Sequence, residues 1–328
     1  MLLKALKLHQ PFHFLLIPII AIILWIKAFM MPQAYPFYPG EDAMILYQPI
    51  SLLLTNSPLL STMMAFAFTL LLAFLILKLN VQYTFIRVRS FLPSSVFILL
   101  TSGVPALHAM HPIYPAALLL VMAIDRIFNS YEKEVIHSNA FDAGILLSLG
   151  SLFYWNLVFF FPLIWFGFIV VKAKVNWREF VLSTIGFAMP WLAAFAYYAA
   201  MGAQDELRQT VMANLTFHNS FLKGNLLHQI YTGYVVLLIL LGSYYLLSQY
   251  DDKRISSRKF FKVFFWVFLI SLILLTAHPA VSQEFIIVIA IPLAYLIGNY
   301  FIFMKHQLWG EVLMYLLIGM IVYLQFAS

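Results

Sequence analysis

The chain has no cysteine and few charged residues, and these two absences exclude several classes of protein. Without cysteine there is no disulfide framework, iron–sulfur cluster or thiolate zinc site. Charged residues make up 10% of the 328 residues, against about 25% in typical soluble domains. Such a chain cannot cover a water-facing surface with polar groups. A soluble enzyme, a nucleic-acid-binding protein and a disordered scaffold are therefore excluded, despite a net charge of +6.

Apolar sequence is abundant instead: hydrophobic residues make up 63% of the chain and aromatic residues 17%. Because a bilayer core needs about 20 apolar residues per helix, the long apolar runs predict membrane-spanning helices. We expect a single all-α domain over residues 1–328, a polytopic transmembrane helical bundle of about eleven spans in contact with membrane lipids. The predicted spans are 12–31, 54–78, 93–108, 113–128, 141–155, 157–172, 180–201, 230–248, 260–277, 284–304 and 310–326.

Basic residues predict how this bundle is oriented. If the N-terminus is cytoplasmic, sixteen of the 19 lysines and arginines fall in cytoplasmic loops, and only Lys27, Arg208 and Lys223 lie outside. Cytoplasmic loops of membrane proteins carry an excess of Lys and Arg, and here the bias runs along the whole chain. The sequence thus predicts a cytoplasmic N-terminus, a periplasmic C-terminus and, with no organelle signal, a bacterial inner membrane.

The first outer loop, residues 31–51, holds the first candidate site. Its four prolines and one glycine stiffen it, and its aromatic rings favour the depth of the lipid headgroups. Glu41 and Asp42 stand in the middle, and such carboxylates can act as a general base. Pro-Gly-Glu-Asp is also ordinary turn sequence, so a solvated turn is the alternative.

Two histidines follow at the next outer turn. His108 and His111 are three residues apart and would share one face of a helical turn. Two imidazoles are an incomplete metal site, since catalytic zinc normally takes three protein ligands. No metal and no cofactor is therefore predicted; the histidines either bind a phosphate or are simply hydrogen-bonded.

Two more outer segments carry ionisable residues. Residues 202–230 form the longest hydrophilic stretch outside, and the spacing of their apolar residues predicts an amphipathic helix on the membrane surface. Within it, Lys223 is the best-placed cation for a lipid phosphate, although a plain anchor helix explains the pattern equally well. His278 and Glu284 flank the last outer turn, where Glu284 either serves a site or satisfies the helix dipole.

These segments, in this order, resemble the GT-C superfold of glycosyltransferases, the type that uses dolichyl- or polyprenyl-phosphate-linked sugars. The resemblance rests on the carboxylates of the first outer loop and on three sequences. These are VPALHAMHPIYPAALLLVMAI (104–124), the paired short helices FDAGILLSLGSLFYWNLVFFFPLIWFGFIVV (141–171) and EFIIVIAIPLAYLIGNYF (284–301). It implies a GT-C-like fold with a polyprenyl-phosphate-linked sugar as the substrate.

The same resemblance implies roles for the candidate residues. Asp42 or Glu41 would be the general base that activates an acceptor hydroxyl, and the polyprenyl phosphate would be the leaving group. The residues that would bind the lipid phosphate or the substrate are His108, His111, Tyr114, Lys223, His278 and Glu284.

Three other functions are alternatives to a transferase. A non-catalytic subunit of an inner-membrane secretion or envelope-assembly complex would explain the poor set of carboxylates. A transporter would require repeats and matching broken helices, which the positions of the prolines do not suggest. A membrane oxygenase would use the outer histidines, but these are scattered without an HxxxH helix.

Overall fold

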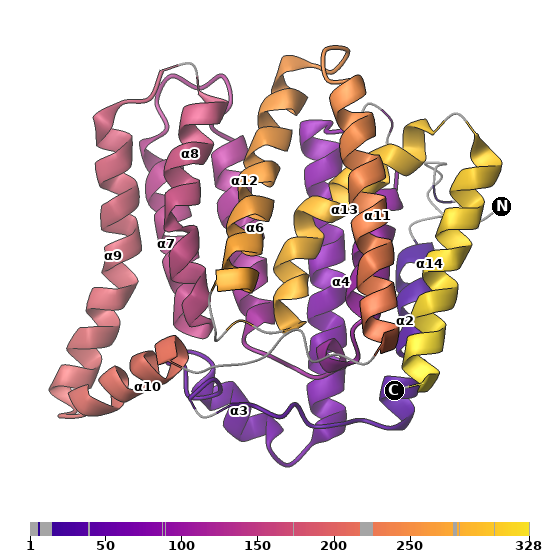
Figure 1. Ribbon diagram of the computed structural model, residues 1–328. Coiled ribbons are helices and arrows are strands. Elements are labelled where there is room, and N and C mark those ends of the chain that lie inside the picture. The colour runs from indigo at the N-terminus through magenta and orange to yellow at the C-terminus, as the bar shows by residue number, and fades with distance from the viewer. Residues whose placement is uncertain are drawn as a thin grey trace.

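The computed structural model describes residues 6, 15–38, 40–86, 88, 90–172, 174–216, 226–277, 281, 283–304 and 306–327. These residues form helices and connecting loops, so the all-α prediction is confirmed. Most helices stand side by side and run alternately up and down in the view of Figure 1. The longer elements are α2 (Leu16–Met30), α4 (Pro58–Tyr83), α5 (Leu92–Ser102), α6 (Ile113–Phe128), α7 (His137–Phe153), α8 (Phe161–Val171), α9 (Trp177–Ala200), α10 (Gln204–Thr216), α11 (Leu226–Ser248), α12 (Ile255–Ala277), α13 (Ile286–Phe303) and α14 (Gln307–Ala327). The short ones are α3 (Gln48–Leu54), η2 (Pro105–His108), η3 (Trp155–Phe160) and η4 (Gln283–Phe285).

The prediction of about eleven membrane spans is wrong. Six of the described helices are long and apolar enough to cross a bilayer: Pro58–Tyr83, Trp177–Ala200, Gln229–Ser248, Ile255–Ala277, Gln283–Phe303 and Leu308–Gln325. The sequence count treated every apolar run as a span, but several of these runs form helices that are too short. At about 1.5 Å per residue, the 11-residue α5 is about 17 Å long, against about 30 Å of hydrocarbon.

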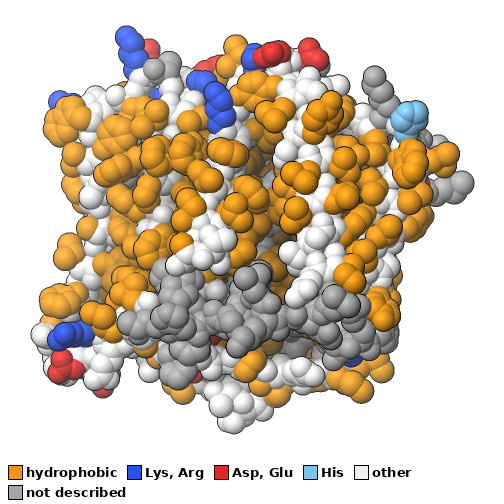
Figure 2. Space-filling model, in the orientation of Figure 1, with side chains coloured by type: hydrophobic (Ala, Val, Ile, Leu, Met, Phe, Trp, Pro, Cys, Tyr) orange, Lys and Arg blue, Asp and Glu red, His pale blue; other side chains and the backbone are white. Residues whose placement is uncertain are grey.

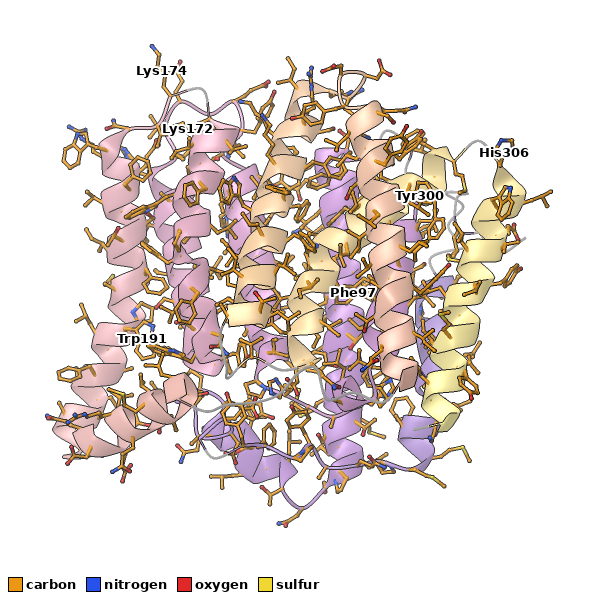
Figure 3. The ribbon with its side chains drawn as sticks, viewed as in Figure 1. Phe97, Lys172, Lys174, Trp191, Tyr300 and His306 are labelled. Atoms are coloured by element: carbon orange, nitrogen blue, oxygen red, sulfur yellow. The ribbon has the colours of Figure 1, made fainter. Side chains whose placement is uncertain are left out.

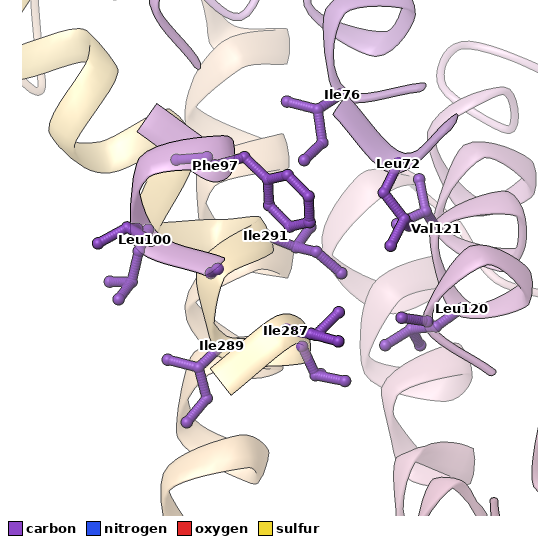
Figure 4. Close-up of a cluster of buried hydrophobic side chains, with 14 of the residues drawn as sticks. Leu72, Ile76, Phe97, Leu100, Leu120, Val121, Ile287, Ile289 and Ile291 are labelled. Carbon is purple, nitrogen blue, oxygen red and sulfur yellow. The ribbon is translucent and has the colours of Figure 1, made fainter. Parts of the chain in front are cut away.

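The short helix α5 is covered by protein instead of lipid. All of its residues from Leu92 to Ser102 are buried. It packs chiefly against α13, where Gly298 lies in contact with Pro93 at the start of α5. Figure 4 shows Phe97 of α5 among Ile76 of α4, Ile291 of α13 and other aliphatic side chains. These side chains belong to one large buried apolar core at the centre of the bundle.

The two ends of the bundle differ in charge. At the upper end of Figure 1, where α4, α6, α8, α11 and α13 finish, Lys172 and Lys174 lie between α8 and α9 (Figure 3). Figure 2 shows hydrophobic side chains over the middle of the face, with Lys, Arg, Asp and Glu at its upper edge and a smaller charged group over α10. This face thus has an apolar middle, with most of its visible charged side chains gathered at the upper edge, as a protein that crosses a bilayer requires.

A buried ion pair holds the start of α9 at the upper end. Lys172 pairs with Glu179, and both side chains are buried. The same lysine donates to the backbone carbonyl of Glu134, 3.0 Å away. Asn176 and Glu179 form a capping box, in which each side chain accepts from the backbone of the first turn of α9. These contacts fix the angle at which α9 leaves α8.

At the lower end, residues 31–57 pass beneath the helices; we call this segment the first loop. Helix α10 lies at the same end, beside the first loop. It occupies part of the hydrophilic stretch predicted at 202–230. The first loop contacts the end of α7, where the Leu46 N–H donates to the Leu152 carbonyl, and the residues just before α6, where Glu41 meets His111.

Candidate functional site

The first loop is fastened to the bundle by buried tyrosines and one tight turn. The Tyr38 hydroxyl donates to Asn214 of α10 at 3.1 Å, and the Tyr47 hydroxyl donates to the Met110 carbonyl at 3.1 Å. At Gly40 the backbone has a φ of +93°, and a Cβ there would come within 2.7 Å of the Ala213 side chain. Glycine is therefore required at this turn, both for its conformation and for the close approach of α10. The turn directs the next residue, Glu41, into the protein.

Glu41 and His111 form a buried hydrogen-bonded pair. Their side chains are 1% and 0% exposed, and Glu41 Oε1 lies 2.7 Å from His111 Nε2. The backbone N–H of Ile113 donates to the other ring nitrogen, Nδ1, at 3.2 Å. Since Nδ1 accepts a hydrogen bond, the ring proton belongs on Nε2, from which it is donated to the Glu41 carboxylate. Both nitrogens of His111 are thereby occupied, and the ring orients Glu41.

A second carboxylate joins this pair from a distant part of the chain. Glu284, in the short helix η4 that leads into α13, is 3% exposed. One potential ligand atom from each of Glu41, His111 and Glu284 lies within 4.8 Å of the other two. We call these three residues the Glu–His–Glu cluster. It joins the first loop, the connection between α5 and α6, and the start of α13 in one buried polar site.

Aromatic rings pack around His111 of the Glu–His–Glu cluster. Tyr35 and Tyr154 meet the His111 ring edge-on, with ring centroids 4.8 and 5.7 Å away, and Phe37 stacks on it at 5.9 Å. Burial, and then the negative charge on Glu41, raise the pKa of the Tyr154 hydroxyl. Burial, followed by the neighbouring Tyr154 and Glu41, likewise raises the pKa of Tyr38. Both phenols therefore stay protonated and uncharged.

A separate pocket of about 330 Å³ opens beside this cluster. Its polar lining includes Lys27 at the last turn of α2, Gln33 and Tyr35 of the first loop, His108 of η2 and Gln325 of α14. The Lys27 ammonium donates to the Gln325 carbonyl, which holds α14 against α2. Because Tyr35 lines the pocket and also touches His111, one aromatic ring separates the pocket from the Glu–His–Glu cluster.

His108 contributes an uncharged ring to this pocket. Its ring meets Trp25 edge-on at 4.5 Å, and its Nε2 atom is buried without a hydrogen-bond partner within the described residues. Burial, and then the positive charge on Lys27, lower the pKa of His108 to about 4. At neutral pH the pocket therefore carries the lysine as its cation, and His108 serves as a neutral donor or acceptor.

This lowered pKa predicts a pH dependence of stability. An unfolded chain would protonate His108 near pH 6.5, whereas the folded chain does so only near pH 4. Between these values the unfolded state binds more protons, so stability is lost as the pH falls. We expect the melting temperature in detergent to drop on acidification from pH 7 to pH 5. The drop should be smaller in His108→Gln, and equal drops in both proteins would contradict the role of His108.

The structure brings some of the predicted site residues together and leaves others apart. Glu41, His111 and Glu284 meet in the Glu–His–Glu cluster, and His108 lines the neighbouring pocket. Asp42 is half-buried on the first loop, near enough to Tyr47 for its charge to raise the pKa of that hydroxyl, after burial and Glu41. Tyr114 is buried, donates to the Leu107 carbonyl and is absent from the lining of the pocket.

The other two predicted residues, Lys223 and His278, lie outside the described residues. Lys27 and Gln325, which line the pocket, were not predicted from the sequence as site residues. Lys27 had one visible signal, because a charged residue in the last turn of an otherwise apolar helix is unusual. Gln325 had none, since the contact between α2 and α14 joins residues nearly 300 positions apart.

Fold and composition together define the class of this protein, a multi-pass, all-α membrane protein with a polar site at one end of the bundle. A family model described as "Family of unknown function (DUF6427)" matches residues 124–328, and the chain belongs to that family. Of the Glu–His–Glu cluster, Glu284 lies in the matched segment, whereas Glu41 and His111 precede it. No curated protein and no solved structure matches the chain.

Proposed function

We propose that this protein is a membrane enzyme that transfers a sugar from a polyprenyl-phosphate carrier, with its site in the pocket at the lower end of the bundle. The observation that carries the proposal is the pocket of about 330 Å³, in which Lys27 lies beside His108, Gln33 and Gln325 at the end of apolar helices. An ammonium with neutral hydrogen-bonding neighbours suits a phosphate headgroup. The isoprenoid would extend along the apolar helices, and the GT-C resemblance supplies the reaction class.

The distribution of charge supports an extracytoplasmic location for this pocket. The lysines between α8 and α9 stand at the opposite end of the bundle (Figure 3), and the basic segment between α11 and α12 also faces that end (Figure 1). By the positive-inside rule, we place that end in the cytoplasm. The pocket then faces the periplasm of a bacterial inner membrane, where polyprenyl-phosphate carriers present their headgroups.

The proposed reaction assigns one role to each group. An acceptor hydroxyl attacks the anomeric carbon while Asp42 takes its proton as general base, reaching the acceptor from the part of the first loop outside the lining of the pocket. The bond between that carbon and the phosphate oxygen breaks, and its electron pair leaves on the phosphate, which Lys27 stabilises. Glu41, held by His111, is a positioning residue that anchors the loop carrying Asp42. Net inversion at the anomeric carbon follows from attack opposite the leaving group.

One observation favours a second function, a non-catalytic subunit of an inner-membrane complex. Glu41, His111 and Glu284 are almost fully buried, and none of them lines the pocket. A buried cluster of this kind could simply lock the first loop in place. In that case the pocket has no substrate, and the lower end contacts a partner membrane protein.

Lipid binding by a Lys27 variant distinguishes the transferase from the non-catalytic subunit. We expect Lys27→Gln to weaken the binding of polyprenyl phosphate to the purified protein about 10-fold or more, because a hydrogen bond to a charged group contributes about 1.5–3 kcal/mol. Affinity can be measured in detergent with a fluorescent polyprenyl phosphate. Lys78→Gln, an exposed lysine on α4 outside the pocket, is the matched control and should leave the affinity unchanged. Equal affinity in wild type and Lys27→Gln would overturn the proposal.

A further inference from the structure

Two buried carboxylates in the Glu–His–Glu cluster create a demand for positive charge. Glu41 and Glu284 each offer an oxygen within 4.8 Å of the other, and both side chains are almost fully buried. Two negative charges this close, removed from water, repel each other strongly unless a cation or a proton lies with them. Among the described residues, the nearby imidazole does not supply that charge, because Ile113 N–H donates to its Nδ1 and thereby favours the neutral ring, and the other oxygen of Glu41 accepts from the uncharged backbone N–H of Tyr38.

A second observation points to a ligand at the same place. The hydroxyl of Tyr154 is buried beside the amide of Asn156, and neither side chain has a well-formed hydrogen bond within the described residues. The Tyr154 ring lies against His111, and its hydroxyl is close enough to Glu41 to respond to the carboxylate charge. Both polar atoms of Asn156 are likewise buried, so the approach of these two side chains to each other leaves hydrogen-bonding capacity unused. Buried polar atoms normally have partners, and an ion with its water molecules would provide them.

The available donor atoms indicate which kind of ion would fit. The carboxylates, the phenol and the amide carbonyl offer oxygen, which Mg²⁺, Mn²⁺ and Ca²⁺ prefer. Zinc would favour the imidazole nitrogen as a ligand. In this structure, however, Nε2 of His111 carries the proton donated to Glu41, so a bound zinc ion would first have to break that hydrogen bond. The chemistry of the cluster therefore favours a hard cation over a soft one.

We propose that Glu41 and Glu284 bind one hard divalent cation, and that His111 orients Glu41 as a hydrogen-bond donor without itself being a ligand. The site connects the first loop to the start of α13, so the ion clamps the loop that closes the lower end of the bundle. This proposal stands apart from the transferase proposal, since it needs neither the pocket nor a lipid substrate.

Metal content and thermal stability of the purified full-length protein test the site. After EDTA treatment we expect MgCl₂, MnCl₂ or CaCl₂ to raise the melting temperature by about 4 °C or more, whereas ZnCl₂ has a smaller effect. Mass spectrometry should find about one hard divalent cation per chain, the number of Glu–His–Glu clusters, and electron spin echo spectra of the Mn²⁺ form should show no directly bound nitrogen.

The variant Glu41→Gln/Glu284→Gln should lose both the bound metal and the metal-dependent rise. Asp205→Asn/Glu206→Gln removes the same two charges from exposed positions of α10 and should keep both. Wild type without bound metal and without a metal-dependent rise would overturn the proposal and indicate that the two carboxyl groups share a proton. Preferential zinc binding with a coordinated nitrogen would overturn the assignment of His111. These two readouts on wild type decide the matter even if the double variant fails to fold.

Discussion

Replacing Gly186 by alanine is expected to destabilise the protein by about 1–3 kcal/mol, and replacing it by leucine by more, because both overpack the interface of α7 and α9. This interface is the most extensive between any two described helices. A Cβ on Gly186 would lie 2.4 Å from the carbonyl oxygen of Phe141, and one on Gly144 would lie 2.3 Å from that of Ser183. Backbone atoms cannot move aside as flexible side chains do, so the helices would have to separate. Thermal unfolding in detergent measures the loss.

The matched control is Gly319→Ala in α14. A Cβ at Gly319 would meet nothing within 4 Å, so this variant should be neutral or slightly more stable, since alanine favours a helix more than glycine does. Small residues let membrane helices approach closely, and the two glycines here make that approach on facing sides of the interface. If Gly186→Ala melts at the wild-type temperature, the close packing of α7 against α9 does not contribute to stability as predicted.

The helices α5, α7 and α9 show what apolar sequence predicts and what it does not. Apolar runs predicted where these helices lie, because an apolar stretch in lipid has to satisfy its backbone hydrogen bonds internally. The runs did not reveal which helices cross the membrane, since a helix such as α5 that is buried in protein is as apolar as one that faces lipid. Length is the better guide: α5 has 11 residues, whereas α9 has 24.

The candidate site was predictable in its residue types but not in its pairing. Glu41 and Asp42 are neighbours in the sequence, and only the turn at Gly40 decides that Glu41 is buried. His108 and His111 were expected to share one face of a helical turn. They do not, because η2 ends at His108 and the chain then becomes extended at Ala109. His108 consequently faces Trp25, while His111 meets Glu41.

Long-range contacts account for the rest of the site. The position of Glu284 at the start of a helix suggested a simple interaction with the helix dipole, and its approach to Glu41 depends on how α13 packs in the core. No local pattern encodes a contact between residues more than 240 positions apart. The same is true of Lys27, whose partner Gln325 is on the last helix.

For the transferase proposal, the largest expected effect on activity belongs to Asp42. Replacing it by asparagine keeps the shape of the side chain and removes the base, so sugar transfer from a polyprenyl-phosphate donor should fall by about 10²–10⁴-fold. The melting temperature should stay close to that of wild type, since Asp42 is half-buried on a loop. Transfer is measured with purified protein, a synthetic donor and the acceptor glycan.

Glu41→Gln distinguishes a base from an anchor. Glutamine retains an oxygen that can accept from His111 Nε2, so the first loop should keep its fold, but the pairing with His111 becomes weaker. As a positioning residue, Glu41 should therefore affect transfer less than Asp42 and stability more. The reverse order would make Glu41 the base, while unchanged transfer in both variants would contradict catalysis at the first loop. If, in addition, Lys27→Gln binds polyprenyl phosphate as tightly as wild type, the non-catalytic subunit is the better explanation of this end of the bundle.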